Sequence, residues 1–269
     1  MKIITNKNKL IKLIEKKKNL GFVPTMGAIH DGHISLIKKS ILKSNKTIVS
    51  IFINKPQFNR KIDFNSYPRN LKKDVLILKK LKIDYLFIPS SKDIYPKGVN
   101  KNIKIDAFGK QLCGINRPNH FEAIADVIDK FIKIIKPAKI FLGEKDMQQL
   151  KIIQHFVHKK YKKIKIVGCE TFREKNGIAY SSRNFLLTQN QKNIASRVYH
   201  LIYYSKKRLL ENKISIKVIK YIVNSLGVDK IDYIKIVDLN KTTKPFKKNS
   251  IYKIFIAYYL GSIRLIDNI

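Results

Sequence analysis

Short apolar runs alternate with longer amphipathic stretches over the first part of the chain. The runs are dense in β-branched and aromatic residues, as in buried strands, whereas the stretches repeat apolar residues every three or four positions, as helices do. Because strands and helices alternate, we expect an α/β fold with a doubly wound, Rossmann-like parallel sheet that helices cover on both faces. The predicted strands are residues 21–23, 47–53, 85–88, 140–142 and 164–167, and the predicted helices begin near residues 31, 71, 121 and 147.

The hydrophobic pattern changes past residue 169. A polar segment is followed by helical stretches and then by strands, and this order indicates an α+β domain. We therefore predict a Rossmann-like domain over 1–169 and a smaller C-terminal α+β domain over 170–269. The predicted elements of the second domain are helices over 189–212 and 216–226 and strands over 233–237 and 252–258.

The most informative segment follows the first predicted strand and reads VPTMGAIHDGH over residues 23–33. Pro24 is expected to end the strand, and a helix is expected to begin near Asp31. Its N-terminus then points unpaired N–H groups and the positive end of the helix dipole at the sheet edge, which favours phosphate. His30 and His33 are three residues apart and share one helix face. The segment is compatible with a nucleotide site, but taken in isolation it is better explained by two capping or surface histidines on an ordinary strand–helix turn.

Further polar segments follow other predicted strands. Residues 54–58 follow the strand that ends at 53, and residues 143–146 follow the strand that ends at 142. In a parallel sheet, ligands bind outside the carboxyl ends of the strands, where these segments meet. Lys145 suits a phosphate, and Asp146 suits ribose hydroxyl groups. Residues 181–184 add two hydroxyl groups and a guanidinium group, which also suit phosphate oxygens. Each segment alone also fits a solvated helix start or a helix cap.

The net charge of +37 raises the alternative of a nucleic-acid-binding protein. Its lysines are scattered along the whole chain, and few of the basic residues are arginine. Nucleic-acid surfaces favour clustered arginine with stacking aromatic side chains. We therefore expect compositional drift rather than a dedicated nucleic-acid site, with salt-sensitive, unspecific binding to polyanions as a side effect.

The chain shows no apolar run long enough to span a bilayer and no secretory signal at its N-terminus. Cys113 and Cys169 lack metal-ligand spacing, and we expect both to be inert thiols in a reduced protein. These features predict a cytoplasmic protein with no membrane association.

Taken in order, several blocks resemble those of the pantoate–β-alanine ligase family. The resemblance extends from Val23 to Asn268, nearly the whole chain, and long blocks in the right order are far more specific than any single block. The blocks are FVPTMGAIHDGH at 22–33, SIFINKPQF at 50–58, YPR at 67–69, GINRPNHFEAI at 114–124, LGEKDMQQL at 142–150, GIAYSSRN at 177–184 and RLIDN at 264–268.

The resemblance implies a two-step, AMP-forming reaction in pantothenate (vitamin B5) and coenzyme A biosynthesis. ATP and (R)-pantoate give pantoyl adenylate and pyrophosphate, and the amine of β-alanine then displaces AMP. It also implies the nucleotidyltransferase type of Rossmann-like sheet that carries a His-x-Gly-His turn, a C-terminal domain that closes over the active site, and a homodimer. Mg²⁺ is expected on the phosphates, and we predict no metal site built from protein side chains alone.

The resemblance also assigns roles to residues of this chain, with His33 as the proton donor to a nucleotide phosphate. The catalytic residues it implies are His30, His33, Lys145, Ser181, Ser182 and Arg183. The implied ATP site consists of Met26, Gly27, Ala28, Ile29, His30, Asp31, Gly32, His33, Gly143, Glu144, Lys145, Asp146, Phe172, Tyr180, Ser181, Ser182 and Arg183. Pantoate is assigned to Asn54, Gln57 and Gln149, and β-alanine to Gln57.

Three positions depart from the family pattern. The proline of the Asn-Pro pair is one place late, at Pro56 after Lys55; Asn119 stands where glycine is usual; and Asp126 replaces a small hydroxyl residue. None removes a proposed catalytic group. Another nucleotidyltransferase with the same histidine turn, such as a cytidylyltransferase, remains the alternative enzyme, although Gln57 and Gln149 and the SSRN block disfavour it.

Overall fold

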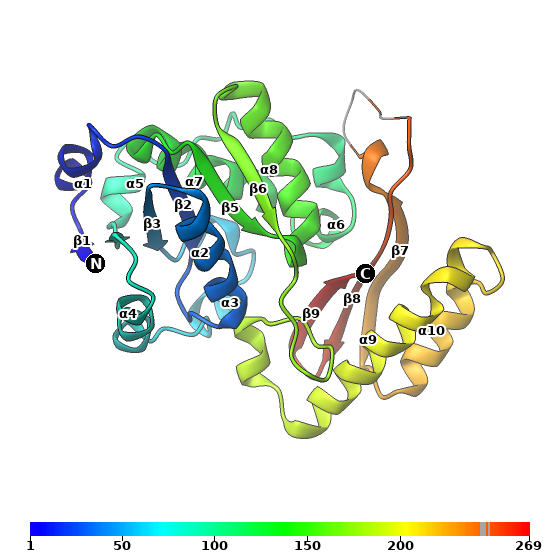
Figure 1. The fold of residues 1–269 in the computed structure, drawn as a ribbon. Coiled ribbons are helices and arrows are strands. Elements are labelled where there is room, and N and C mark those ends of the chain that lie inside the picture. Colours follow the sequence, from blue (N-terminus) through cyan, green and yellow to red (C-terminus); the bar gives the residue numbers. More distant parts are fainter. Residues whose placement is uncertain (243–245, 247) are drawn as a thin grey trace. The chain divides into compact units, whose positions relative to one another are not determined.

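The computed structural model describes residues 1–242, 246 and 248–269. These residues form two compact units. The first comprises Met1–Glu144 and Gln148–Glu170, and the second comprises Lys145–Met147 and Thr171–Ile269. Figure 1 shows the elements of each unit in sequence colours.

The first unit is built on a parallel six-stranded sheet with the order β1-β4-β3-β2-β5-β6. The chain runs outward from β2 through β3 to β4, and it then returns to the other side of β2 to form β5 and β6. The doubly wound parallel sheet that the hydrophobic pattern predicts is thus confirmed. The strands are β1 (Lys2–Ile4), β2 (Leu20–Thr25), β3 (Lys46–Ile51), β4 (Tyr85–Phe87), β5 (Lys139–Gly143) and β6 (Lys165–Cys169).

Helices cover both faces of this sheet because successive strand residues point to opposite sides. Val23 belongs to an apolar cluster with Ile37 of α2 on one face. Phe22, its neighbour, meets Phe131 of α7 on the other face, at 5.1 Å between ring centroids. The helices of this unit are α1 (Lys7–Ile14), α2 (Asp31–Lys43), α3 (Lys61–Asn65), α4 (Leu71–Lys80), α5 (Ser91–Ile94), α6 (Cys113–Asn116), α7 (His120–Ile135) and α8 (Met147–Lys160, from Gln148 onward), with short 3₁₀ turns η1 (Lys55–Gln57), η2 (Ala107–Lys110) and η3 (Glu144–Asp146, in part).

The expectation that Pro24 ends the first predicted strand is wrong. β2 continues through Pro24 to Thr25, and Pro24 is paired in register with Ser50 of β3. Proline has no N–H to give to a ladder. The pairs between β2 and β5 involve only Gly21 and Phe22, so Pro24 lies beyond that ladder, where a missing donor costs little.

The second unit contains an antiparallel sheet of β7 (Lys230–Asp238), β8 (Tyr252–Leu260) and β9 (Ile263–Asn268). Two helices, α9 (Gln189–Leu210) and α10 (Ile216–Ser225), share an apolar core with these strands. The short turns η4 (Ser182–Leu186) and η5 (Leu239–Lys241) complete the unit. The smaller α+β portion predicted for the C-terminal part is confirmed.

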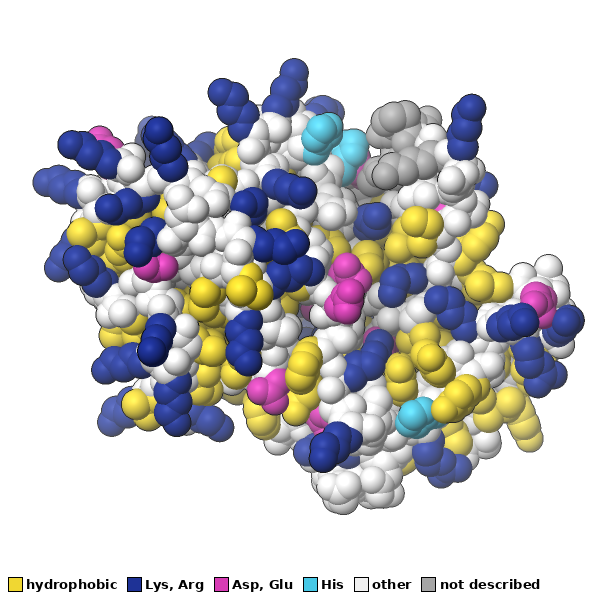
Figure 2. All heavy atoms as spheres, in the orientation of Figure 1, with side chains coloured by type: hydrophobic (Ala, Val, Ile, Leu, Met, Phe, Trp, Pro, Cys, Tyr) yellow, Lys and Arg dark blue, Asp and Glu magenta, His cyan; other side chains and the backbone are white. Residues whose placement is uncertain are grey.

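Two further observations concern the distribution of charge and the hydropathy of the helices. Figure 2 shows lysine and arginine side chains spread over the visible face rather than gathered in one stripe. Among the residues that the structure describes, no helix is both long and apolar enough to cross a membrane.

Candidate active site

The turn after β2 lies at the topological switch point of the sheet. β2 pairs with β3 on one side and with β5 on the other, and the chain leaves in opposite directions from these two neighbours. In open α/β sheets, ligands bind in the crevice beyond the carboxyl ends of the strands at this point. α2 begins there, at Asp31, and contacts both β2 and β5. The predicted nucleotide segment therefore occupies the place where this fold binds ligands.

Hydrogen bonds of the Thr25 side chain hold this turn in an uncommon conformation. The Thr25 hydroxyl donates to the Ser50 carbonyl at 2.6 Å and accepts from the Gly27 N–H at 3.2 Å. Gly27 has a φ of +83°, and Ala28 follows with a φ of +50°. A left-handed alanine is unfavourable by about 1–2 kcal/mol, so other contacts must stabilise the turn.

Asp74 of α4 supplies those contacts, and the sequence reasoning missed it. Its two carboxylate oxygens accept from the Ala28 N–H at 2.9 Å and the Ile29 N–H at 2.7 Å. The side chain is buried. Burial raises its pKa above the usual aspartate value, although the two backbone hydrogen bonds work in the opposite direction. The available signal was a single acidic residue among the lysines and apolar residues of the predicted helix.

His30 and His33 come together at the start of α2, as their spacing predicts. His30 is the N-cap residue, with extended backbone, and His33 lies in the first turn. Their ring centroids are 4.0 Å apart, and the rings are tilted by 33°. Both side chains are half-buried. The pair thus sits beside the unpaired N–H groups of the helix, where an anion is favoured.

A second group of polar side chains lies on η1, directly after β3. Asn54 is buried and is the N-cap residue of η1, and Gln57 is its last residue. The Asn54 amide nitrogen donates to Gln57 Oε1 at 3.1 Å and to the Ala123 carbonyl at 3.2 Å. Tyr95, which the sequence reasoning also missed, donates from its hydroxyl to Asn54 Oδ1 at 2.7 Å.

Gln57 connects this group to the nucleotide turn. Its Nε2 lies 3.3 Å from Met26 Sδ, in a hydrogen-bond contact. The Gln57 carbonyl accepts from Arg117 Nη2 at 3.3 Å, and His120 Nδ1 lies 2.8 Å from the same oxygen. Three segments that are distant in sequence therefore meet around Gln57.

The two neighbouring glutamines of α8 differ in what they contact. Gln148 is buried, and its amide bridges three backbone groups: it accepts from the Cys113 N–H and donates to the carbonyls of Phe108 and Gln111. Gln149 is half-buried, and its amide makes no hydrogen bond to any residue that the structure describes. Gln149, the predicted ligand residue, is thus the one whose amide is available.

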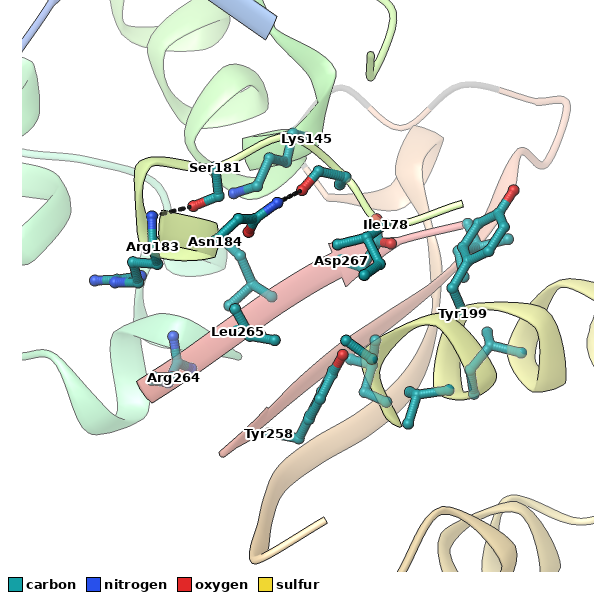
Figure 3. A pocket seen from close by; sticks show the side chains of 17 residues that line it. Lys145, Ile178, Ser181, Arg183, Asn184, Tyr199, Tyr258, Arg264, Leu265 and Asp267 are labelled. Atoms are coloured by element: carbon teal, nitrogen blue, oxygen red, sulfur yellow. Dashed lines mark hydrogen bonds between the residues drawn. The ribbon is translucent and has the colours of Figure 1, made fainter. Parts of the chain in front are cut away.

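The remaining predicted residues belong to the second unit, apart from Gly143, the last residue of β5, and Glu144, the first residue of η3. Lys145 lies in η3, its ammonium group 3.7 Å from Asp146. Its carbonyl accepts from the Asn268 side chain at 2.8 Å, so the last sequence block holds the lysine backbone. Lys145, Ser181 and Arg183 line one pocket of this unit (Figure 3).

Hydrogen bonds within the second unit fix the serine–arginine segment. Ser181 is the N-cap residue of η4, and its hydroxyl accepts from the Arg183 N–H at 3.2 Å. Ser182 is buried directly after it. Asn184 is also buried and donates to Glu174 and to the Ala179 carbonyl at 2.9 and 3.1 Å.

A hairpin-like loop precedes this segment. Its ends are joined by a bridge between Arg173 and Ala179, and the predicted nucleotide residues Phe172 and Tyr180 lie beside each other with ring centroids 5.5 Å apart. Arg173 binds Asp267 of β9 through both terminal nitrogens, at 2.6 and 2.9 Å. Neither Arg173 nor Asp267 was among the predicted site residues.

Comparison with known proteins decides the family. The family model described as pantoate-beta-alanine ligase matches residues 2–269. The chain belongs to the pantoate–β-alanine ligase family. A pantothenate synthetase of Ruthia magnifica is 41% identical over 94% of this chain and 91% of the relative, and one of Pseudothermotoga lettingae is 36% identical over 100% and 97%. The resemblance and the enzyme class that the sequence blocks predict are confirmed.

Solved structures of ligases agree with this fold. A pantoate-beta-alanine ligase from Francisella tularensis, complexed with beta-gamma ATP and beta-alanine, has a TM-score of 0.85 at 37% identity and covers 100% of this chain and 97% of its own. The pantothenate synthetase from Thermus thermophilus has a TM-score of 0.89 at 27% identity, covering 100% and 99%.

The departures from the ligase pattern have simple structural consequences. Asn119 has a φ of +60° and so adopts the left-handed backbone that glycine would provide. Pro56 lies in the first turn of η1, where no helical N–H is needed, and Gln57 keeps its place. Asp126 is fully buried, accepts from the Asn100 N–H at 2.9 Å and lies 3.7 Å from the Lys130 ammonium group.

Proposed function

We propose that this ligase uses ATP to join (R)-pantoate to β-alanine through a pantoyl-adenylate intermediate. We carry ATP and β-alanine over as substrates from the Francisella tularensis relative, which is complexed with beta-gamma ATP and beta-alanine. The observation that carries the proposal is the contact between Met26 Sδ and Gln57 Nε2 at 3.3 Å, within the first unit. It joins a residue assigned to ATP with one assigned to pantoate, so the two substrates would meet at this point.

The first step is the attack of a pantoate carboxylate oxygen on the α-phosphorus of ATP. A bond from this oxygen to phosphorus forms, the bond to the bridging oxygen breaks, and pyrophosphate leaves with the electron pair. Negative charge grows on the α-phosphate and on the departing pyrophosphate, so preorganised donors and cations accelerate the step. We assign this role to His30, His33, Lys145 and the 181–183 segment, with His33 giving its proton to a phosphate oxygen.

Pantoate needs donors for its carboxylate and for two hydroxyl groups. Amide side chains suit such a substrate because each offers both donors and an acceptor without a fixed charge. We assign Gln57 and Gln149 to this task, with Asn54 beside Gln57. The Gln149 amide supports the assignment, since it has no hydrogen-bond partner among the described residues.

In the second step the neutral amine of β-alanine attacks the acyl carbon of the adenylate. The carbon–nitrogen bond forms, the acyl–phosphate bond breaks, and AMP leaves with the electron pair while the amine loses a proton. We place β-alanine beside Gln57. The donors that stabilised charge on the α-phosphate then stabilise AMP as the leaving group.

Mg²⁺, a homodimer and a cytoplasmic location remain predictions. Among the described residues, no cluster of three or more histidine, cysteine or acidic side chains is arranged to hold a metal ion. We expect Mg²⁺ to bind through the phosphates and to neutralise part of their charge. No step above depends on it.

The intermediate can be tested by following oxygen atoms. With pantoate labelled with ¹⁸O in its carboxylate, a mixed anhydride transfers one labelled oxygen to AMP, and mass spectrometry of the AMP detects it. AMP without label would refute the adenylate.

Pyrophosphate assays separate the alternatives. We expect pyrophosphate release from ATP only when pantoate is present, and AMP release only after β-alanine is added. Turnover of CTP with a phosphorylated alcohol would instead favour a cytidylyltransferase. Sequence-selective nucleic-acid binding at high salt, without ATP chemistry, would favour the nucleic-acid alternative.

A further inference from the structure

Tyr95 lies outside every block assigned to substrate, yet its hydroxyl is at one end of a hydrogen-bond chain that leads to the proposed pantoate site. It follows α5 as its C-cap residue and is half-buried, with its ring 6.3 Å from that of Phe52. Its hydroxyl donates to Asn54 Oδ1 at 2.7 Å. Asn54 in turn donates to Gln57 Oε1 at 3.1 Å.

The donor and acceptor roles along this series of hydrogen bonds follow from the groups at its ends. The Ala123 carbonyl can only accept, so the side of the Asn54 amide that faces it, at 3.2 Å, is the nitrogen. The oxygen of Asn54 then faces Tyr95, which must donate. The second hydrogen of the Asn54 nitrogen points to Gln57, which must present its oxygen there.

The Gln57 amide is therefore left with its nitrogen on the other side. One of its hydrogens points toward Met26 Sδ at 3.3 Å, and the other has no protein acceptor among the described residues. Gln57 thus offers an N–H donor to a ligand and not its carbonyl oxygen.

We propose that Tyr95 is a positioning residue for pantoate, which fixes the Asn54 amide so that Gln57 presents its N–H group to the carboxylate and hydroxyl oxygens of the substrate. This inference rests on the proposed function, in which Gln57 binds pantoate. Asn54 is 1% exposed, so without the tyrosine hydroxyl its oxygen would be buried without a donor. The amide would then be held only through its nitrogen, and Gln57 would lose its fixed orientation.

The surroundings of Tyr95 keep its hydroxyl a donor. Burial raises its pKa well above the usual tyrosine value, and the nearby charge of Asp126 raises it further. The hydroxyl therefore stays protonated over the pH range in which the ligase would be assayed.

Tyr95→Phe tests the inference, because it removes only the hydroxyl and retains the ring beside Phe52. Pyrophosphate release is measured with pantoate varied at saturating ATP and β-alanine, and then with ATP varied. We expect the KM for pantoate to rise about tenfold, the effect of losing one well-placed hydrogen bond, while the KM for ATP stays within about twofold.

Tyr161→Phe is the matched control. The Tyr161 hydroxyl also donates to a side-chain oxygen at 2.7 Å, that of Asp129, in the same unit. The substitution should lower the thermal midpoint without changing the KM for pantoate. If both variants change this KM equally, Tyr95→Phe acts by destabilising the first unit as a whole, and the inference is wrong.

A double-mutant cycle shows whether Tyr95 acts through Gln57. If it does, Tyr95→Phe adds nothing to Gln57→Ala, and the double variant has the pantoate KM of Gln57→Ala alone. Additive effects would overturn the inference. If Gln57→Ala itself leaves the KM for pantoate unchanged, the proposed function of Gln57 fails first.

Gln57→Glu checks the same idea without altering Tyr95. A carboxylate at this position accepts from Asn54 as before, but it offers an oxygen where the amide offered an N–H. We expect it to raise the KM for pantoate by more than Gln57→Ala does, because two carboxylates would face each other. A smaller effect than that of alanine would show that Gln57 does not act as a donor.

Discussion

Asp74→Ala is the substitution that best tests how the nucleotide turn is held. It removes the only side chain that accepts from the Ala28 and Ile29 N–H groups in the described structure, at 2.9 and 2.7 Å. A buried N–H without a partner costs about 1–3 kcal/mol, so two would cost about 2–6 kcal/mol. Part of this is offset because burial of the carboxylate is itself unfavourable, as its raised pKa indicates. We expect a net loss of about 3 kcal/mol in the free energy of unfolding.

Urea denaturation measures this loss, and Asp63→Ala provides the control. Asp63 is also an aspartate near a helix start, but it is exposed, so its removal should change the free energy of unfolding by less than about 0.5 kcal/mol. Asp74→Ala should also slow pantoate-dependent pyrophosphate release, because the turn leads directly into the histidine pair. A free energy of unfolding within about 0.5 kcal/mol of the wild type would refute the reasoning.

Five further substitutions test other parts of the structure. His33→Ala should abolish adenylate formation and leave the thermal midpoint nearly unchanged; near-normal turnover would contradict its assigned role. Gln148→Ala should lose about 3 kcal/mol of stability because three backbone partners lose their bonds, whereas Gln149→Ala should mainly raise the KM for pantoate; the reverse pattern would exchange their roles. Gly177→Ala should destabilise the second unit by at least about 2 kcal/mol, since its φ is +87° and a Cβ there would overlap the ring of Tyr199. An unchanged melting curve would show that this ring can move aside. Burial raises the pKa of Asp129, but hydrogen bonds from two lysines and a tyrosine outweigh this effect and leave the pKa below the ordinary value of 3.8. The ionised Asp129 therefore stabilises the folded protein fully above pH 3.8, and this stabilisation is lost as the pH falls through the lower folded pKa. Asp129→Asn should therefore be less stable than the wild type at neutral pH but lose less stability in acid, and parallel acid titrations of the two proteins would contradict this.

Much of the first unit's sheet could be predicted because its strands are buried on both faces. Phe22 and Val23 point to opposite sides and both are apolar, so the strand is visible as an apolar run. β1 and α1 were not predicted. β1 has only three residues and two of them, Lys2 and Ile3, are exposed, so hydrophobic periodicity has too little to act on.

The polar residues that hold the site were harder to find, because their partners are backbone groups far away in sequence. Asp74 is 45 and 46 residues from the N–H groups that it binds, and Tyr95 is 41 residues from Asn54. Sequence blocks mark where unusual residues gather, but a single aspartate in a lysine-rich helix is a much weaker signal. The adjacent glutamines of α8 illustrate the same limit, since the orientation of the helix about its axis in the fold decides which of the two amides is buried.

A common principle separates the polar side chains around the site into two kinds. Asp74 and Asn268 use their polar atoms on backbone groups of turns that carry proposed substrate residues, and Gln148 does the same for backbone groups of the 108–113 segment. Such bonds fix a loop because buried backbone groups must be paired. Gln57 and Gln149 instead keep at least one amide hydrogen without a protein acceptor among the described residues. We therefore expect the first kind to keep these turns in one arrangement before substrates bind, because preorganised groups need no rearrangement during the reaction.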